Sequence, residues 1–116
     1  MNTADMERIM EQFLTAQCMR IFKTKNAAYA QTDLTQDGMD NFKKESASVG
    51  IRFEQYWAVL WGKHKRAMET WVRTGVAPAE IYKILCDLIV YELILYCHLV
   101  EIGEVDHEAV MKDETN

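Results

Sequence analysis

Apolar residues recur every three or four positions through most of the chain, which is the spacing of amphipathic helices. The first segment with this spacing begins near Thr3, a candidate N-cap, and ends near Lys25-Asn26. Its apolar positions are Met6, Ile9, Met10, Phe13, Leu14, Cys18, Ile21 and Phe22. Residues 27–37 are polar and aperiodic, and they predict a loop after this first helix.

Three more helices follow in the pattern. A short helix is predicted from about Gly38 to Val49, with Gly50 as its stop signal. A third helix is predicted to begin near Arg52 and to end at Gly75. The apolar stripe of this third helix consists of Phe53, Trp57, Leu60, His64, Met68 and Trp71.

The fourth helix is predicted to start at Pro78, because a first-turn position needs no backbone N–H. It runs to about Glu101, with Gly103 just beyond its end. Residues 104–116 are acidic and polar, and they predict a frayed tail with at most one turn of helix. Residues 1–103 therefore predict a single all-α domain, a four-helix bundle. One proline and five glycines are too few for the frequent turns of a β-sandwich or barrel.

Charge and cysteine content narrow the classes of partner and compartment. The chain has 116 residues and a net charge of −5, which argues against general nucleic-acid binding because phosphates require a basic surface. The longest apolar stretch, residues 84–100, contains three ionisable side chains and does not predict a membrane span. Three cysteines are too few for a disulfide framework, and Cys86 and Cys97 would lie about three helical turns apart. With no signal peptide at the charged N-terminus, these features predict a protein of the reducing cytoplasm.

A polar stripe runs along the otherwise apolar fourth helix. Its members follow one another at steps of seven, four and seven, and they therefore share one helix face. They are Glu80, Asp87, Tyr91 and His98. Buried carboxylates require a partner, usually a lysine or a divalent cation, and oxygen ligands suit Mg²⁺. A second acidic group, Asp37, Asp40 and Glu45, brackets the short helix and either joins such a site or merely favours the helix start.

A basic cluster at residues 62–66 lies within the third helix. Lys63 and Arg66 share one face at a spacing of three, so they either bind phosphates together or form a solvated surface. The segment lacks the earlier glycine and the following serine or threonine of a phosphate-binding loop. His64 and His98 lie among apolar residues without the partners of a catalytic triad, and both are expected to be hydrogen-bonded core residues.

Four short motifs occur in order along the chain. They are Lys25-Asn26 followed by Tyr29, Asp40-Asn41-Phe42, Gly62-Lys63-His64, and Asp87 with Tyr91. Together they resemble the motifs of small MazG-like all-α nucleotide pyrophosphohydrolases, and the phage-encoded branch associated with nucleotide metabolism is the most similar. The likeness covers about residues 20–100. It implies a helical bundle that binds Mg²⁺ through carboxylates on facing helices and cleaves a nucleoside triphosphate to the monophosphate and pyrophosphate by attack of water on the α-phosphorus.

The resemblance also implies a set of site residues. Of the metal ligands it implies Asp87 alone; a rearranged set would add Glu80 from the fourth helix and Asp40 or Glu45 from the second. The implied nucleotide-binding residues are Lys25, Asn26, Tyr29, Asn41, Lys63 and Tyr91. Within this set the lysines would neutralise the phosphates, and Asn26 and Tyr29 would line the base or ribose pocket. The metal would stabilise charge and position a water nucleophile, and no residue is assigned as the general base.

The chain departs from the MazG-like pattern at its carboxylates. Ile84 stands where the Glu-x-x-Asp motif has its glutamate, and no Glu-Glu-x-x-Glu segment occurs in the sequence. Ala28 and Ala30 replace an aspartate and a glycine of the first loop. One hypothesis is Mg²⁺-dependent pyrophosphohydrolysis with a rearranged ligand set. The alternatives are a protein, phage-encoded for instance, that binds or sequesters a nucleotide without hydrolysis, and a helical protein-interaction module.

The composition of the fourth helix predicts self-association. Between Ile84 and Val100 apolar residues occupy almost every angle of the helix, and a helix apolar all round must be covered all round. The other three helices cover about one side of it, and Trp61 lies off the main stripe of the third helix. We therefore expect a homodimer or homotetramer built through the third and fourth helices, unless the fourth is the central helix of a monomer.

Overall fold

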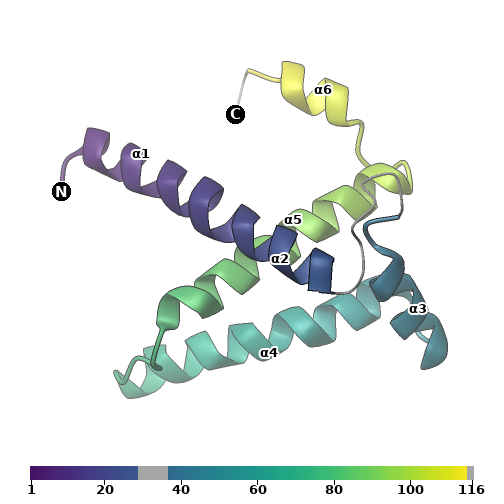
Figure 1. The fold of residues 1–116 in the computed structure, drawn as a ribbon, viewed down its shortest axis with the longest axis horizontal. Helices are drawn as coiled ribbons and strands as arrows, with labels where there is room; N and C mark the ends of the chain where they lie inside the picture. The colour runs from purple at the N-terminus through teal and green to yellow at the C-terminus, as the bar shows by residue number, and fades with distance from the viewer. Residues whose placement is uncertain (29–36, 115–116) are drawn as a thin grey trace.

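The computed structural model describes residues 1–28 and 37–114, and it describes the side chains of residues 1–24 and 37–114. Its elements are α1 (Thr3–Gln12), the π-helical segment η1 (Phe13–Cys18), α2 (Met19–Ala28), α3 (Asp40–Ser48), α4 (Phe53–Thr74), α5 (Ile81–Glu101) and α6 (His107–Lys112). Every regular element in the described residues is helical, which confirms the all-α class (Figure 1). The four predicted helical regions are all present, and α6 adds to them.

The two longest helices, α4 and α5, run antiparallel and side by side (Figure 1). Gly75 ends α4 with a left-handed φ of 74°, which side chains other than glycine rarely adopt. Glu80 is also left-handed, with φ of 54°, and α5 begins only at Ile81. Pro78 therefore lies in the connection between the helices, and the prediction that it occupies the first turn of α5 is wrong.

The first predicted helix is a continuous rod of α1, η1 and α2 that crosses α5 (Figure 1). Its N-cap is Asn2 rather than Thr3, because the Asn2 side chain accepts a hydrogen bond from the backbone N–H of Asp5 at 2.8 Å. The widened π-helical turn spans the part of the rod that packs on α5 and carries Phe13 and Cys18 there.

The crossing of the rod over α5 forms the most buried part of the described chain. Cys18 and Cys86 are completely buried there, beside Val90. The two thiols are free, and the Cys18 Sγ donates to the Cys86 Sγ at 3.3 Å. Burial, and next the contact with Cys86, raises the pKa of Cys18 to about 12. The Cys18 thiol is therefore protonated and unreactive near neutral pH.

The chain after α5 is more ordered than the sequence predicts. Gly103 turns the chain with φ of 82°, as expected from its place beyond the helix end. Asp106 then caps α6 by accepting from two backbone N–H groups of its first turn, and the Tyr96 hydroxyl contacts the His107 Nδ1 at 2.8 Å. These contacts hold a six-residue helix, so the expectation of at most one turn is wrong.

Candidate functional site

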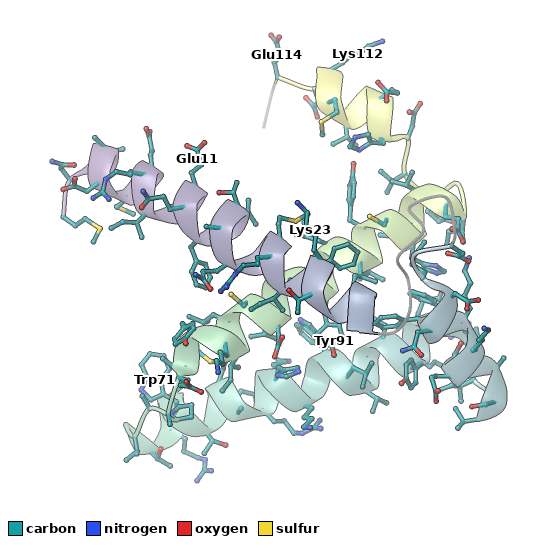
Figure 2. The ribbon with its side chains drawn as sticks, viewed as in Figure 1. Glu11, Lys23, Trp71, Tyr91, Lys112 and Glu114 are labelled. Atoms are coloured by element: carbon teal, nitrogen blue, oxygen red, sulfur yellow. The ribbon has the colours of Figure 1, made fainter. Side chains whose placement is uncertain are left out.

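A cavity of about 190 Å³ lies where α2, α3, α4 and α5 meet. Its aromatic and polar lining is Phe22, Asn41, Phe42, Tyr56, Asp87 and Tyr91. Tyr91 lies in the region where α2 approaches the α4–α5 pair (Figure 2). The remaining wall residues are Gly38 and the aliphatic Leu60, Val90 and Ile94, so the cavity combines aromatic and aliphatic walls with two polar side chains.

The ring of Phe42, in the first turn of α3, packs against both long helices. Its centroid lies 5.8 Å from that of Tyr56 on α4 and 6.2 Å from that of Tyr91 on α5, and both pairs are edge-on. It also stacks on Phe53 at 5.4 Å. Edge-on and offset arrangements are the favoured ones for aromatic pairs. This packing fixes the start of α3 and thereby holds the neighbouring Asn41 at the cavity.

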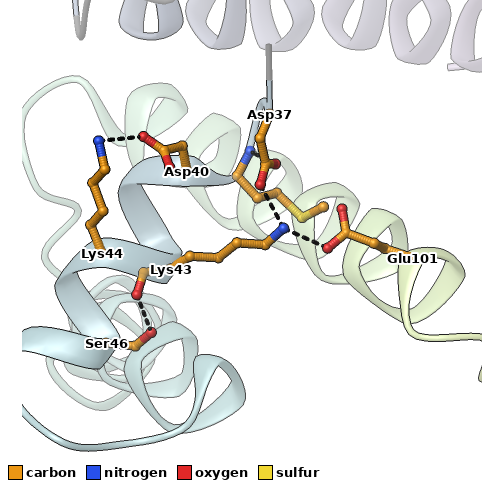
Figure 3. Close-up of polar contacts among 7 residues, drawn as sticks. Asp37, Asp40, Lys43, Lys44, Ser46 and Glu101 are labelled. Atoms are coloured by element: carbon orange, nitrogen blue, oxygen red, sulfur yellow. Dashed lines mark hydrogen bonds and ion pairs between the residues drawn. The ribbon is translucent and has the colours of Figure 1, made fainter.

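Ion pairs attach the same end of α3 to the rest of the chain (Figure 3). The Lys43 Nζ lies 2.6 Å from a carboxylate oxygen of Asp37 and 2.6 Å from one of Glu101 at the end of α5. The hydrogen bond from Lys43 lowers the pKa of Asp37, and the two carboxylates raise the pKa of Lys43. Lys43 therefore serves to attach α3 to α5 in this structure.

The polar stripe of α5 faces α4. The His64 Nδ1 lies 3.7 Å from the Asp87 Oδ2, and the His64 ring lies 5.5 Å from that of Tyr91. The Trp57 indole N–H donates to the Tyr91 carbonyl at 2.6 Å. Together with His98, described next, these contacts confirm that three of the four stripe residues share one face. Glu80 does not, because it precedes the helix and pairs with a neighbouring lysine at the surface.

His98 occupies the other end of this interface. Its ring stacks on Phe53 with centroids 3.8 Å apart, and only 6% of the residue is exposed. Its Nε2 contacts the Glu54 Oε1 at 2.7 Å, while its buried Nδ1 has no hydrogen-bond partner among the described residues. The hydrogen bond with His98 lowers the pKa of Glu54. His98 is thus the core histidine that its apolar surroundings in the sequence predict.

The four residues predicted to bind Mg²⁺ have different surroundings. Asp87 lines the cavity, whereas Asp40 pairs with a lysine one turn away on α3 at 2.8 Å. Glu45 is exposed on α3, and Glu80 lies at the surface before α5. No group of three or more His, Cys, Asp or Glu in the described part of the chain is arranged to hold a metal ion. Because one or two carboxylates together with substrate phosphates can hold Mg²⁺, the Mg²⁺ site stays a prediction.

The predicted nucleotide-binding residues divide into three groups. Asn41 and Tyr91 line the cavity. Lys63 is exposed on α4 and is not among the residues that line it. The side chains of Lys25 and Asn26, and the whole of Tyr29, lie outside the described residues.

Sequence reasoning missed two aromatic members of the lining, Phe22 and Tyr56. The spacing of Phe22 predicts a core position, and Tyr56 lies off the main apolar stripe of its helix. The sequence feature that could have identified Tyr56 is its large ring on a polar side of an amphipathic helix. Such a ring indicates that a second face of the helix packs against another element.

Comparison of the chain with models of known protein families, with curated proteins and with solved structures gave no match. None of the helices within residues 1–28 and 37–114 combines the length and the apolar character needed to cross a membrane. The chemistry of the cavity is therefore the basis for the function proposed next.

Proposed function

We propose that the chain binds a nucleotide, or a small molecule derived from one, by enclosing its base in the cavity between α2, α3, α4 and α5. The observation that supports this proposal is the convergence of residues far apart in the sequence. Asn41 and Phe42 from α3 line the same cavity as Asp87 and Tyr91 from α5. These are motif residues of the MazG-like resemblance, and we propose that the helical bundle is of the same type.

The lining suits a planar heterocycle. Phe42, Tyr56 and Tyr91 supply rings against which a base can stack or pack edge-on. The Asn41 amide both donates and accepts hydrogen bonds, and the Asp87 carboxylate accepts them, so the two side chains can match the amino and carbonyl groups at a base edge. The volume of about 190 Å³ is below the roughly 300–1,000 Å³ typical of pockets for larger ligands. The base would fill it, with ribose and phosphates outside.

The described lysines near this cavity are paired with carboxylates or lie outside its lining, which favours recognition through the base over recognition through the phosphates. Lys43 pairs with two carboxylates, and Lys44 pairs with Asp40 at 2.8 Å. Lys63 is exposed and does not line the cavity. Base contacts would therefore supply most of the affinity, and the predicted phosphate contact of Lys25 would add to it. Such a protein binds a nucleotide tightly whether or not a metal ion is present.

Mg²⁺-dependent hydrolysis to the nucleoside monophosphate and pyrophosphate is the second candidate. The observation that favours it is the place of Asp87, a carboxylate at the edge of the proposed base site. Binding without hydrolysis ranks above it because Asp40 and Glu80 each pair with a lysine. We place either activity in the cytoplasm, that of a bacterial host if the chain is phage-encoded, because all three cysteines are free thiols.

Titration calorimetry with the common ribo- and deoxyribonucleotides, each in EDTA and again in Mg²⁺, tests the proposal. We expect at least one nucleotide to bind with similar affinity in both buffers. Asn41→Ala should weaken that binding about tenfold, the effect of losing one or two hydrogen bonds to a buried ligand. The control Lys63→Ala, an exposed residue outside the lining, should leave it within about twofold.

The same samples distinguish binding from hydrolysis. Pyrophosphate release from a triphosphate in Mg²⁺ would establish the second candidate in place of the first. Absence of binding by every nucleotide, with the helical circular-dichroism spectrum intact, would refute both and leave the protein-interaction module. A loss of affinity in Lys63→Ala with none in Asn41→Ala would show that a nucleotide binds elsewhere.

A further inference from the structure

A second cavity, of about 210 Å³, adjoins the one proposed to hold the base. It lies between α2, the residues just before α3, and α5, in the region where α2 passes over α5 (Figure 1). Its described lining has no charged, hydroxyl or amide side chain, and it consists of Met19, Phe22, Gly38, Met39, Val90, Leu93, Ile94 and Cys97. We call this space the apolar cavity, and we call the space lined by Asn41 and Asp87 the base cavity.

The two cavities share part of their walls. Phe22, Val90 and Ile94 line both of them, and so does Gly38. The backbone of Gly38 is not in the left-handed region that favours glycine. Apart from its neighbours in the chain, no described atom lies within 4 Å of the place that a Cβ on Gly38 would take. Gly38 therefore leaves open space in the shared wall, and one ligand can extend from the base cavity into the apolar cavity.

The lining of the apolar cavity selects the chemical group that can occupy it. A phosphate, a ribose hydroxyl or a water molecule placed there would lose hydrogen bonds to solvent, and the described side chains would not replace them. An apolar group has no such cost, and a dry apolar cavity of about 150 Å³ is already large enough for benzene. Met19 and Met39 add flexible side chains whose sulfur atoms make favourable contacts with aromatic rings. The group that fits best is therefore an apolar ring.

We propose that the ligand of this chain is a nucleotide whose base carries an apolar substituent, with the base in the base cavity and the substituent in the apolar cavity. This inference rests on the proposed function and narrows its class of ligand. Because ribose and phosphates stay outside the base cavity, the substituent leaves the base from an edge remote from the sugar. It also covers Met19 and Leu93, which are 36% and 40% exposed and which an unsubstituted base would not reach.

Titration calorimetry in EDTA with matched pairs of nucleotides tests the inference. The pairs are AMP, GMP, CMP and UMP, each beside its derivative N6-benzyl-AMP, O6-benzyl-GMP, N4-benzyl-CMP or 5-benzyl-UMP. Burying one methylene group strengthens binding about fourfold. We therefore expect at least one benzyl derivative to bind at least about tenfold more tightly than its parent.

The ratio of the two affinities within a pair is then measured in two variants. Leu93→Asp should lower this ratio at least about fivefold, because it places a carboxylate in the wall of the apolar cavity. The matched control is Leu85→Asp, a leucine of the same helix that is 39% exposed and lines neither cavity. The control should leave the ratio within about twofold of its original value.

Cys97 provides a measurement on the unmodified chain, which serves if Leu93→Asp fails to fold. This thiol is exposed and lies in the wall of the apolar cavity, so a maleimide can reach it. A saturating benzyl nucleotide should slow its alkylation at least about tenfold, because the benzyl group covers the sulfur. The parent nucleotide at saturation should change the rate by less than about twofold.

The outcomes separate this inference from the proposed function. Binding of a parent nucleotide with no gain from any benzyl group would overturn the inference and leave the proposed function standing. Equal protection of Cys97 by a parent and its benzyl derivative would also overturn the inference, as would a gain that Leu93→Asp and Leu85→Asp reduce equally. Absence of binding by all eight nucleotides would refute the proposed function, and this inference with it.

Discussion

The helices α4 and α1 have similarly amphipathic patterns but different surroundings. The long helices contact each other through specific groups in antiparallel order, whereas α1 carries its apolar face into solvent. Phe53 and Glu54 at the start of α4 contact His98, and His64 farther along contacts Asp87. The comparison teaches that apolar spacing is sufficient to predict a helix, while rings and hydrogen-bonding groups between helices decide what it packs against.

The largest expected effect is the loss of a ring from the packed region. Phe53→Ala should lower the free energy of unfolding by about 3–5 kcal/mol, because Phe53 is buried between Phe42 and His98. Val72→Ala, which truncates an exposed side chain of the same helix, should change it by less than about 0.5 kcal/mol. Chemical denaturation monitored by circular dichroism measures both, and equal effects would remove the distinction between packed and exposed positions.

The buried thiols give the next effect in size. Cys18→Ser should cost about 1–3 kcal/mol, because it buries a hydroxyl in the apolar cluster, beside the Cys86 Sγ. The matched control is Cys97→Ser, since Cys97 is exposed on α5 and should tolerate the change. In alkylation of the native chain with a maleimide, Cys97 should react rapidly and Cys18 only on unfolding. Rapid modification of Cys18 in the folded protein would contradict its packing.

The smallest effect concerns the pH dependence of the α4–α5 contact. The lowered pKa of Glu54 contributes stability that is fully present above its ordinary pKa of 4.5 and is lost as the pH falls through the lower folded value. Because the Glu54 side chain is 45% exposed, solvent screening limits this contribution to less than about 1 kcal/mol.

Glu54→Gln should therefore be less stable than the unmodified chain at pH 7, and the difference should shrink below pH 4.5. Denaturation at a series of pH values measures it, with Glu45→Gln, an exposed residue of α3, as the control. A difference that stays constant down to pH 3 would show that the His98 contact does not depend on the charge of Glu54.

The sequence predicted the all-α class and most helix boundaries because those depend on local spacing and on glycine. Gly75 and Gly103 stop their helices where they were expected to. The start of α5 was misplaced because the left-handed backbone of Glu80 leaves no mark in the hydrophobic pattern. The π-helical turn was missed for a similar reason, since one extra residue in a turn barely disturbs an apolar spacing of three and four.

The candidate site was predicted only in part, because it depends on contacts between distant segments. Asn41 and Tyr91 do line one cavity with Asp87, as the motifs suggested. Of the other predicted carboxylates, Asp40 and Glu80 each pair with a nearby lysine and Glu45 is exposed. Helical periodicity does not show whether a carboxylate pairs with a lysine, faces solvent or joins a site. The contact of Cys18 with Cys86, 68 residues later, was equally hidden, because each looks like an ordinary apolar position.

The most direct test of base binding in the cavity is amide hydrogen exchange. It is measured on the full chain in EDTA at one protein concentration, with and without saturating deoxyribonucleotides. A nucleotide enclosed by the cavity should slow exchange in the first turn of α3, around Asn41, and in α5 between Asp87 and Tyr91. It should leave α1 unchanged, because no residue of α1 lines the cavity. No change in α3 and α5 with any nucleotide, or a change confined to α1, would contradict the proposal that this cavity binds the base.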